Sequence, residues 1–415
     1  MDDLIFLAHR IPYPPDKGDK IRSYHLLRHL AQRYRVHLGA FVDDPHDWRH
    51  AEALRALCAS VHLVGLKPAW ARLKALAGLI TGEALTLAYY RHPAMAAWVR
   101  GRLSAGVRRV VCYSSAVAQF VIDAEGVQRV MDFVDIDSDK WRQYARNRPW
   151  PAAWLYRREA ERLFAWERRV AAAFDVSLFV SPPEAEDFRR LAPEVADRVG
   201  WYVNGVDTEY FSPEHDAASP YPAGAEPIVF TGAMDYWPNV DAVTWFAQEV
   251  LPAVRAQRPQ ALFAIVGSRP ARAVQELANH AGVMVTGRVP DVRPYLHHAR
   301  VAVAPLRIAR GIQNKVLEAM AMARTVVVSP QALEGITARP SKEVLLADDR
   351  EAWVQAVLAA LNGLDLGPAA RTRVERDYDW AARLAGLVAL IEGGRLPQNA
   401  ADSHTGVVAA PEPAI

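Results

Sequence analysis

Short apolar runs alternate with helical stretches through the first half of the chain. Helices are expected at residues 24–33 and 45–58. The apolar runs are Leu4–Ala8, Val36–Val42, Val61–Val64, Arg109–Tyr113, Val130–Val134 and Val176–Val180. Runs that are this short and this continuously apolar are typical of strands buried on both faces, as in a parallel sheet covered by helices.

A second series of apolar runs follows, separated from the first by residues 201–222, which are rich in Gly, Asp, Ser and Pro. Its members are Ile228–Thr231, Leu262–Val266, Val283–Thr286, Val301–Ala304, Thr325–Ser329 and Val344–Ala347. The pattern predicts an α/β protein of two doubly wound, Rossmann-like domains that face each other across a cleft. We expect these domains at 1–200 and 223–378, a linker at 201–222, a closing helix at 379–394 and a disordered tail at 395–415.

Composition narrows the function classes. A chain of 415 residues with 51% hydrophobic content can bury two cores, and a formal charge of +2 gives no reason to expect nucleic acid as a partner. Two cysteines, Cys58 and Cys112, exclude a disulfide framework and a cysteine-based zinc site. The N-terminus resembles a first strand more than a signal peptide, and no apolar run is long enough to span a bilayer. A cytoplasmic location is therefore expected.

Residues 301–328 carry the clearest candidate chemistry. They are predicted to form a βαβ unit, whose loop lies at the carboxyl end of a parallel strand, where open α/β sheets bind ligands. A helix beginning near Gly311 would direct free N–H groups at a phosphate. Three basic residues lie beside that loop: Arg307, Arg310 and Lys315. Glu318, one turn further, could accept hydrogen bonds from sugar hydroxyls. The alternative is a plain crossover helix with a solvated basic loop.

A second candidate is the acidic run that follows the strand Val130–Val134. It contains Asp132, Asp135, Asp137 and Asp139. Closely spaced carboxylates could bind a metal ion, but Asp135 or Asp137 could equally position or deprotonate a hydroxyl. The alternative is a loop that caps a helix beginning at Ser138 or Asp139.

Several motifs together resemble a known family. YVNGVDTEYFSP at 202–213, FTGAMDYWPNVDAVTWF, IVGSRP, VTGRVPDVRPYL and NKVLEAMA resemble the retaining GT-B glycosyltransferases of the family 4 class. The stretches LAHRIPYPPDKGDKIRSYHLL and MDFVDIDSDKW resemble more narrowly the sugar transferases associated with exosortase and PEP-CTERM systems. The resemblance covers residues 4–392.

The resemblance implies a hexosyltransferase of exopolysaccharide biosynthesis. Such an enzyme moves a sugar from a nucleotide-sugar donor to a glycan or polyprenyl-linked acceptor with retention of configuration, and needs no metal or cofactor. Two alternatives share the architecture: a GT-B sugar-nucleotide epimerase, which needs no acceptor, and a non-catalytic GT-B binding or scaffold protein.

The resemblance also implies roles for individual residues. Glycines in βα turns let a nucleotide approach the backbone. Donor binding is expected at Gly18, Lys20, Gly232, Met234, Gly267, Arg288, Val289, Arg307, Arg310, Gly311, Ile312, Lys315 and Glu318. Catalytic roles are expected for Asp19, Asp135 and Asp137, although Asp19 could instead cap the helix that follows it.

The chain departs from the family pattern at two places. The family carries a pair of glutamates across the phosphate loop, and Arg310 occupies the first of these positions here. A basic pair after the first strand of the C-terminal domain is replaced by Asp235 and Asn239. Arg307, Arg310 and Lys315 are then expected to carry more of the diphosphate charge.

Two stretches suggest peripheral contact with a membrane. Between Lys140 and Val170, Lys and Arg outnumber Glu, and tryptophans are interleaved at positions 141, 150, 154 and 166. A short helix from Lys67 would place Trp70, Leu73, Ala77 and Ile80 on one face. The alternative is that Leu155, Leu163, Trp166 and Val170 pack inward under a solvated basic face.

Overall fold

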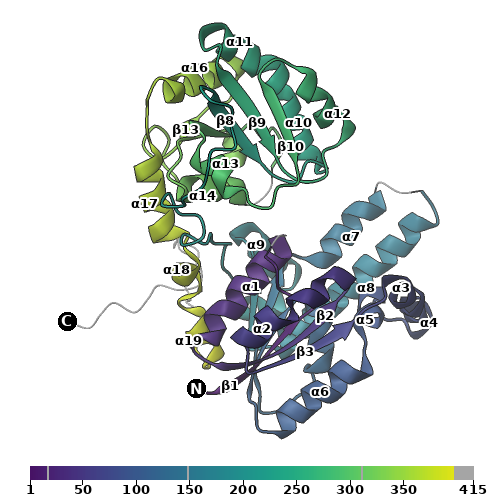
Figure 1. Ribbon diagram of the computed structural model, residues 1–415. Helices are drawn as coiled ribbons and strands as arrows, with labels where there is room; N and C mark the ends of the chain where they lie inside the picture. The colour runs from purple at the N-terminus through teal and green to yellow at the C-terminus, as the bar shows by residue number, and fades with distance from the viewer. Residues whose placement is uncertain (16–17, 147–148, 310–311, 397–415) are drawn as a thin grey trace. The chain divides into compact units, whose positions relative to one another are not determined.

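The computed structural model describes residues 1–15, 18–146, 149–309 and 312–396, and these form two compact units (Figure 1). The first unit contains Met1–Val203 and the chain from Arg383 onward, and the second contains Asn204–Ala382. The boundary at Val203 and Asn204 falls inside the predicted linker. Residues 397–415, most of the predicted tail, lie outside the described residues.

The first unit contains a parallel sheet of seven strands in the order β3-β2-β1-β4-β5-β6-β7. The strands are β1 (Asp3–Ala8), β2 (Arg35–Val42), β3 (Ser60–Gly65), β4 (Arg109–Tyr113), β5 (Gln128–Val134), β6 (Val176–Phe179) and β7 (Val199–Trp201). The six strands expected from the apolar runs are confirmed. The seventh, β7, was missed because it has only three residues at the edge of the predicted linker.

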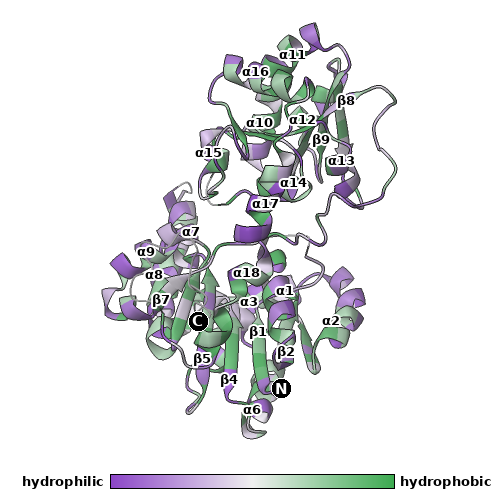
Figure 2. Ribbon diagram, turned by 90° about the vertical axis from the view of Figure 1, so that its left-hand side faces the viewer, coloured by the Kyte–Doolittle hydropathy of each residue, from purple (hydrophilic) through white to green (hydrophobic). Residues whose placement is uncertain are grey.

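Helices connect the successive strands of this sheet. They are α1 (Gly18–Ala31), η1 (Pro45–His50), α2 (Ala51–Leu57), α3 (Pro68–Ala75), α4 (Ala77–Thr81), α5 (Leu85–Tyr90), α6 (Pro93–Ser104), η2 (Ser115–Phe120), α7 (Asp137–Arg146), α8 (Ala152–Ala173), α9 (Pro182–Leu191), η3 (Pro193–Arg198) and α19 (Leu387–Ile391). Residues 4–8 of β1 are fully buried, since helices cover both faces of the sheet. Figure 2 shows β1, β4 and β5 in the green of apolar residues.

The second unit contains a parallel sheet of six strands in the order β10-β9-β8-β11-β12-β13. The strands are β8 (Glu226–Thr231), β9 (Ala261–Val266), β10 (Val283–Gly287), β11 (Val301–Ala304), β12 (Val326–Val328) and β13 (Leu345–Leu346). The accompanying helices are α10 (Trp237–Trp245), η4 (Phe246–Val250), α11 (Leu251–Gln257), α12 (Arg272–Glu276), η5 (Leu277–Asn279), α13 (Arg293–His297), α14 (Asn314–Ala321), α15 (Pro330–Leu333), α16 (Arg350–Leu361) and α17 (Gly367–Asp377). The boundary between the two units falls within the next helix, α18 (Trp380–Leu384). Both units are thus Rossmann-like, as predicted.

The closing helix predicted at 379–394 is two short helices, α18 and α19, interrupted at Ala385 and Gly386. The second helix returns the chain to the first unit. There the Gln128 side-chain amide donates to the Leu390 carbonyl at 3.2 Å. The Tyr34 hydroxyl donates to Glu392 at 3.3 Å. The glycine explains the break, because glycine is among the weakest helix formers.

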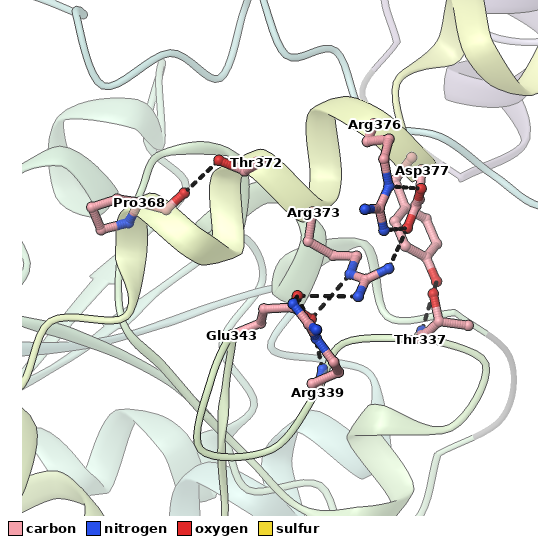
Figure 3. A network of polar contacts seen from close by, with 9 residues as sticks. Thr337, Arg339, Glu343, Pro368, Thr372, Arg373, Arg376 and Asp377 are labelled. Carbon is pink, nitrogen blue, oxygen red and sulfur yellow. Dashed lines mark hydrogen bonds and ion pairs between the residues drawn. The ribbon is translucent and has the colours of Figure 1, made fainter.

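A polar network in the second unit joins α17 to the loop after α15 (Figure 3). The buried Glu343 carboxylate accepts hydrogen bonds from the Arg373 and Arg339 guanidinium groups, with the Arg373 Nε bond at 3.0 Å. Burial alone would raise the pKa of Glu343, but these donors outweigh it and lower the pKa to about 2. The same loop comes near Ile312, since a Cβ added at Gly335 would lie 3.2 Å from the Ile312 side chain.

We expect Glu343→Gln to lower the free energy of unfolding by about 1.5 to 3 kcal/mol, because hydrogen bonds to a charged acceptor are lost. The depressed pKa of Glu343 makes this contribution complete above its ordinary value of 4.5 and lost as pH falls through about 2. Urea denaturation at neutral and at acid pH measures both effects. Glu334→Gln, at an exposed position of the same loop, is the control. Equal stabilities of the two variants at neutral pH would contradict the assignment.

Candidate functional site

Two glycine turns follow β8 and β9 and touch each other. The Gly232 amide donates to the Val266 carbonyl at 3.0 Å. A Cβ added at Gly267 would lie only 1.6 Å from the Gly232 carbonyl oxygen. Any side chain at position 267 would therefore push the two turns apart. The contact brings together the backbones of two turns at the carboxyl ends of the neighbouring strands β8 and β9.

The Met234 backbone links the turn after β8 to the turn after β9 through hydrogen bonds. Its amide donates to the Ser268 carbonyl at 2.8 Å, and its carbonyl accepts from the Ala271 amide at 2.9 Å. The Met234 side chain is fully buried in the core. Its predicted donor-binding role is thus restricted to shaping the backbone that a ligand would meet.

Lys315, in the first turn of α14, directs its amine at the Gly232 turn. The amine donates to the Asn239 side-chain oxygen at 2.6 Å and lies 4.2 Å from the centre of the Phe230 ring. Asn239 in turn donates to the Ala233 carbonyl at 2.9 Å. A Cβ at Gly232 would be 3.3 Å from the Lys315 amine. A ligand resting on the Gly232 turn would therefore meet this cation.

Burial controls the charge of this site. Burial lowers the pKa of Lys315 to about 7, while the Glu318 carboxylate opposes that shift. Burial also raises the pKa of Glu318 to about 7, against the effect of Lys315. Both Lys315 and Glu318 are half-buried residues. The pKa values of both groups therefore lie near neutral pH.

The helix that carries both residues begins at Asn314, later than the predicted start near Gly311. Arg310 and Gly311 lie outside the described residues. Ile312 is described, and its side chain would lie 3.2 Å from a Cβ added at Gly335, in the loop held by Glu343. The predicted helix, its lysine and its glutamate are present, but the turn before it extends further than the sequence suggested.

The remaining predicted donor contacts are placed differently. Arg307 forms a bidentate pair with Asp241, with Nε at 2.8 Å from the carboxylate, so its charge is already matched within the unit. Arg288 is exposed and Val289 half-buried, directly after Gly287, whose φ of +68° favours glycine. These two side chains border the end of β10, the edge strand of the sheet.

In the first unit, α1 begins at Gly18, which is exposed and where an added Cβ would meet no atom within 4 Å. Asp19 therefore lies in the first turn and is not the residue that caps the helix. Its carboxylate accepts from Arg10 at 2.6 Å and lies 3.9 Å from the His9 ring. Burial lowers the pKa of His9, although Asp19 opposes this shift.

Lys20 is buried, and its amine binds the Asp47 carboxylate at 2.7 Å. Its predicted contact with a donor would require that pair to open. Arg22 is also committed: it donates to Asp132 at 2.9 Å and stacks 3.5 Å from the centre of the Tyr202 ring. Asp132, the first member of the acidic run, is therefore a buried structural anion.

Asp135 and Asp137 lie together at the start of α7. The Lys140 amine binds both carboxylates, at 2.8 Å and 3.0 Å. Burial would lower the pKa of Lys140, but the two carboxylates outweigh it and raise that pKa. The helix begins at Asp137 itself, one or two residues before the predicted capped start. Both carboxylates remain about one-third exposed, at 32% and 35%.

The sequence patterns did not reveal Glu167, a fully buried residue of α8 beneath this loop. Its carboxylate accepts from the Ser138 amide at 3.1 Å and the Ser138 hydroxyl at 2.6 Å. Burial, reinforced by Asp137, raises the pKa of Glu167 to about 8. The available signal was a glutamate on the same helical face as the buried Leu163 and Val170.

Metal binding and membrane spanning find no support in the described part of the chain. Among the described residues, no group of three or more His, Cys, Asp or Glu side chains could hold a metal ion. Within the same residues, no helix is long and apolar enough to cross a membrane.

Comparison with known proteins now identifies the architecture. Sucrose-phosphate synthase from Thermosynechococcus elongatus matches with a TM-score of 0.64 at 18% identity, covering 95% of this chain and 99% of that one. Anabaena HepE in complex with UDP and glucose matches with a TM-score of 0.62 at 13% identity, covering 95% and 100%. The chain has the GT-B fold. WaaG, a glycosyltransferase involved in lipopolysaccharide biosynthesis, shares this GT-B fold with a TM-score of 0.59 at 14% identity, covering 94% and 100%.

A family model agrees with the fold. Residues 225–363 match the model described as glycosyl transferases group 1. This segment contains both glycine turns, Lys315 and Glu318. No curated protein matches the sequence significantly. The matched segment covers about a third of the chain and belongs entirely to the second unit.

We expect Gly267→Ala to destabilise the second unit by about 3 kcal/mol or more, because its methyl group would overlap the Gly232 carbonyl. Chemical denaturation measures the change. Gly101→Ala, in α6, has no atom within 4 Å of the added Cβ and is expected to gain about 0.5 to 1 kcal/mol. A Gly267→Ala protein as stable as the native one would show that the turns can separate freely.

Proposed function

We propose that this protein is a retaining, nucleotide-sugar-dependent hexosyltransferase that acts in the cytoplasm on a glycan or polyprenyl-linked acceptor during exopolysaccharide biosynthesis. The GT-B fold and the family-model match over residues 225–363 support sugar transfer. The observation that carries the proposal is the Lys315 amine held beside the Gly232 turn, with Glu318 one helical turn away.

The proposed chemistry follows from that arrangement. An acceptor hydroxyl attacks the anomeric carbon of the donor, the bond from that carbon to the diphosphate oxygen breaks, and a nucleoside diphosphate leaves. Lys315 and the N-terminal end of α14 stabilise the negative charge that grows on the diphosphate. Glu318 accepts hydrogen bonds from sugar or ribose hydroxyls. Charge stabilisation of this kind needs no metal and no cofactor, and we propose none.

The acceptor proton has two destinations in this scheme. It passes either to the leaving diphosphate or to Asp135 or Asp137, which are partly exposed and share Lys140. We assign Asp19 to the same group of carboxylates, because its exposed fraction of 30% leaves it open to a substrate. Glu167 beneath Ser138 keeps the start of α7 in place.

Labelled nucleotide sugars test the proposal against its two alternatives. The purified protein is incubated with a panel of donors, with and without a membrane lipid extract as acceptor source. Release of nucleoside diphosphate that depends on the extract supports sugar transfer. Isomerisation of the donor without any acceptor would support an epimerase, and binding without turnover would support a scaffold protein.

Lys315→Met separates function from stability. Loss of the cation should raise the activation barrier by about 2.7 to 4 kcal/mol, which lowers kcat/KM roughly 100-fold to 1000-fold. The unfolding free energy should change by only about 1 kcal/mol, since relief from burying an amine offsets the unsatisfied Asn239 oxygen. Lys342→Met, at an exposed position, is the matched control. Normal turnover by Lys315→Met would place the diphosphate elsewhere.

Donor binding should also depend on pH. Above its pKa of about 7 the Lys315 amine is mostly neutral, so binding the diphosphate must bring a proton to it. Donor affinity is therefore expected to fall as pH rises from about 7 to about 9, by at most about tenfold per unit. Calorimetry with a nucleotide sugar that binds measures this slope. Glu318→Gln should keep the slope but move it to lower pH, because the Glu318 carboxylate no longer raises the pKa of Lys315. Lys315→Met should abolish the slope; a slope kept in Lys315→Met and lost in Glu318→Gln would assign the titration to Glu318.

A further inference from the structure

Helices α3 and α4 of the first unit bury small residues and expose large apolar ones. Their buried residues are small: Ala71, Ala75 and Gly78. All five large apolar residues point to solvent: Trp70 is 63% exposed, Leu73 58%, Leu76 46%, Leu79 38% and Ile80 92%. A helix that served only the core would show the opposite distribution. An exposed apolar surface of this kind marks a contact with something outside the unit.

Basic residues accompany the apolar ones. Lys67, Arg72 and Lys74 lie within the same two turns, and the segment from Lys67 to Gly82 contains no Asp or Glu. Arg72 and Lys74 are exposed and alternate with the exposed apolar side chains. Apolar residues mixed with unopposed positive charge fit an anionic lipid surface. They fit a protein partner less well, because lysine is depleted from protein interfaces.

The N-terminal part of α8 extends this surface. Arg158 donates to the Gly78 carbonyl of α4 at 2.6 Å and to the Glu83 carbonyl at 3.1 Å. Trp154 lies one turn earlier on the same face of α8 and is 54% exposed. Trp150 precedes the helix and is 82% exposed. Figure 1 shows α3 and α4 beside this part of α8.

The structure divides the sequence-level membrane hypothesis into two parts. The inward-packing alternative holds for the second half of α8, where Leu163 and Val170 are fully buried and the Trp166 indole donates to the Ser115 carbonyl at 2.9 Å. At the start of α8, Trp154 is exposed, as are the large apolar residues of α3 and α4. The candidate surface thus contains the predicted stretch that follows Lys67, which forms α3 and α4, but only the start of the predicted stretch from Lys140 to Val170.

We propose that α3, α4 and the start of α8 form a docking surface for an anionic phospholipid membrane, called here the α3–α4 surface. Its apolar side chains enter the interface between headgroups and acyl chains, and Arg72 and Lys74 contact the lipid phosphates. Tryptophan suits this depth because its ring is apolar and its N–H is polar. The surface belongs to the first unit, whereas Lys315 and the glycine turns belong to the second, and its argument does not depend on the proposed sugar transfer.

Flotation with lipid vesicles tests the surface. The full-length protein is mixed with vesicles of phosphatidylcholine alone or of phosphatidylcholine with phosphatidylglycerol, at low and at high salt. We expect binding to the anionic vesicles at low salt, and weaker binding at high salt because exposed charges are screened. Arg72→Glu with Lys74→Glu should weaken binding at least about 30-fold, from about 1 kcal/mol for each basic residue.

A second pair of variants tests the apolar part. Trp70→Ser with Ile80→Ser should reduce binding at least about tenfold. Trp48→Ser with Leu364→Ser, at other exposed apolar positions, should leave it unchanged. Native protein that stays unbound with anionic vesicles at low salt would overturn the proposal. So would equal binding by the two pairs, or a dimer by light scattering that Trp70→Ser with Ile80→Ser dissociates. Donor binding measured without vesicles reports separately on the proposed function.

Discussion

The central strands of both sheets are covered by helices on two faces, and this constraint decides where chemistry can occur. Residues 4–8 of β1 and 263–266 of β9 have no exposed surface. Groups that can meet a ligand are therefore expected at the turns that follow the carboxyl ends of the strands, where backbone and side chains again meet solvent. In the second unit the outcome is the pair of glycine turns, close enough to exclude any side chain, with Lys315 directed at them from α14.

Much of this arrangement could be predicted from the sequence, because it depends on local patterns. Continuous apolar runs predicted the strands, and glycines after β8 and β9 predicted the turns. The pairing of charged groups could not be predicted, since it joins distant positions: Lys20 with Asp47, and Arg307 with Asp241. In each pair a carboxylate binds a cation that the sequence offered for phosphate binding. The start of α14 was also misplaced, because Gly311 suggested a helix start three residues before Asn314.

Lys315 differs from these other cations in the kind of partner that holds it. Lys20 and Arg307 bind carboxylates, whereas the Lys315 amine donates to the neutral oxygen of Asn239. A carboxylate partner would compete with an anionic ligand, but an amide orients the amine without neutralising it. The departure from the family pattern, Asn239 in place of a basic residue, thus keeps Lys315 in position while adding no second charge. Because burial removes water from around the amine, the pKa of Lys315 is lowered to about 7.

Long-range hydrogen bonds from α8 explain how α3 and α4 can turn large apolar residues outward and remain in place. Neighbouring residues of α8 hold both sides of the α4–α5 connection. Arg158 binds the Gly78 and Glu83 carbonyls, and the fully buried Glu159 accepts from the Leu85 amide at 2.6 Å. A carboxylate at the N-terminus of α5 also complements its dipole. Because polar contacts from α8 and small side chains anchor this segment, Trp70 and Ile80 are not needed for its packing and are left for contact outside the unit.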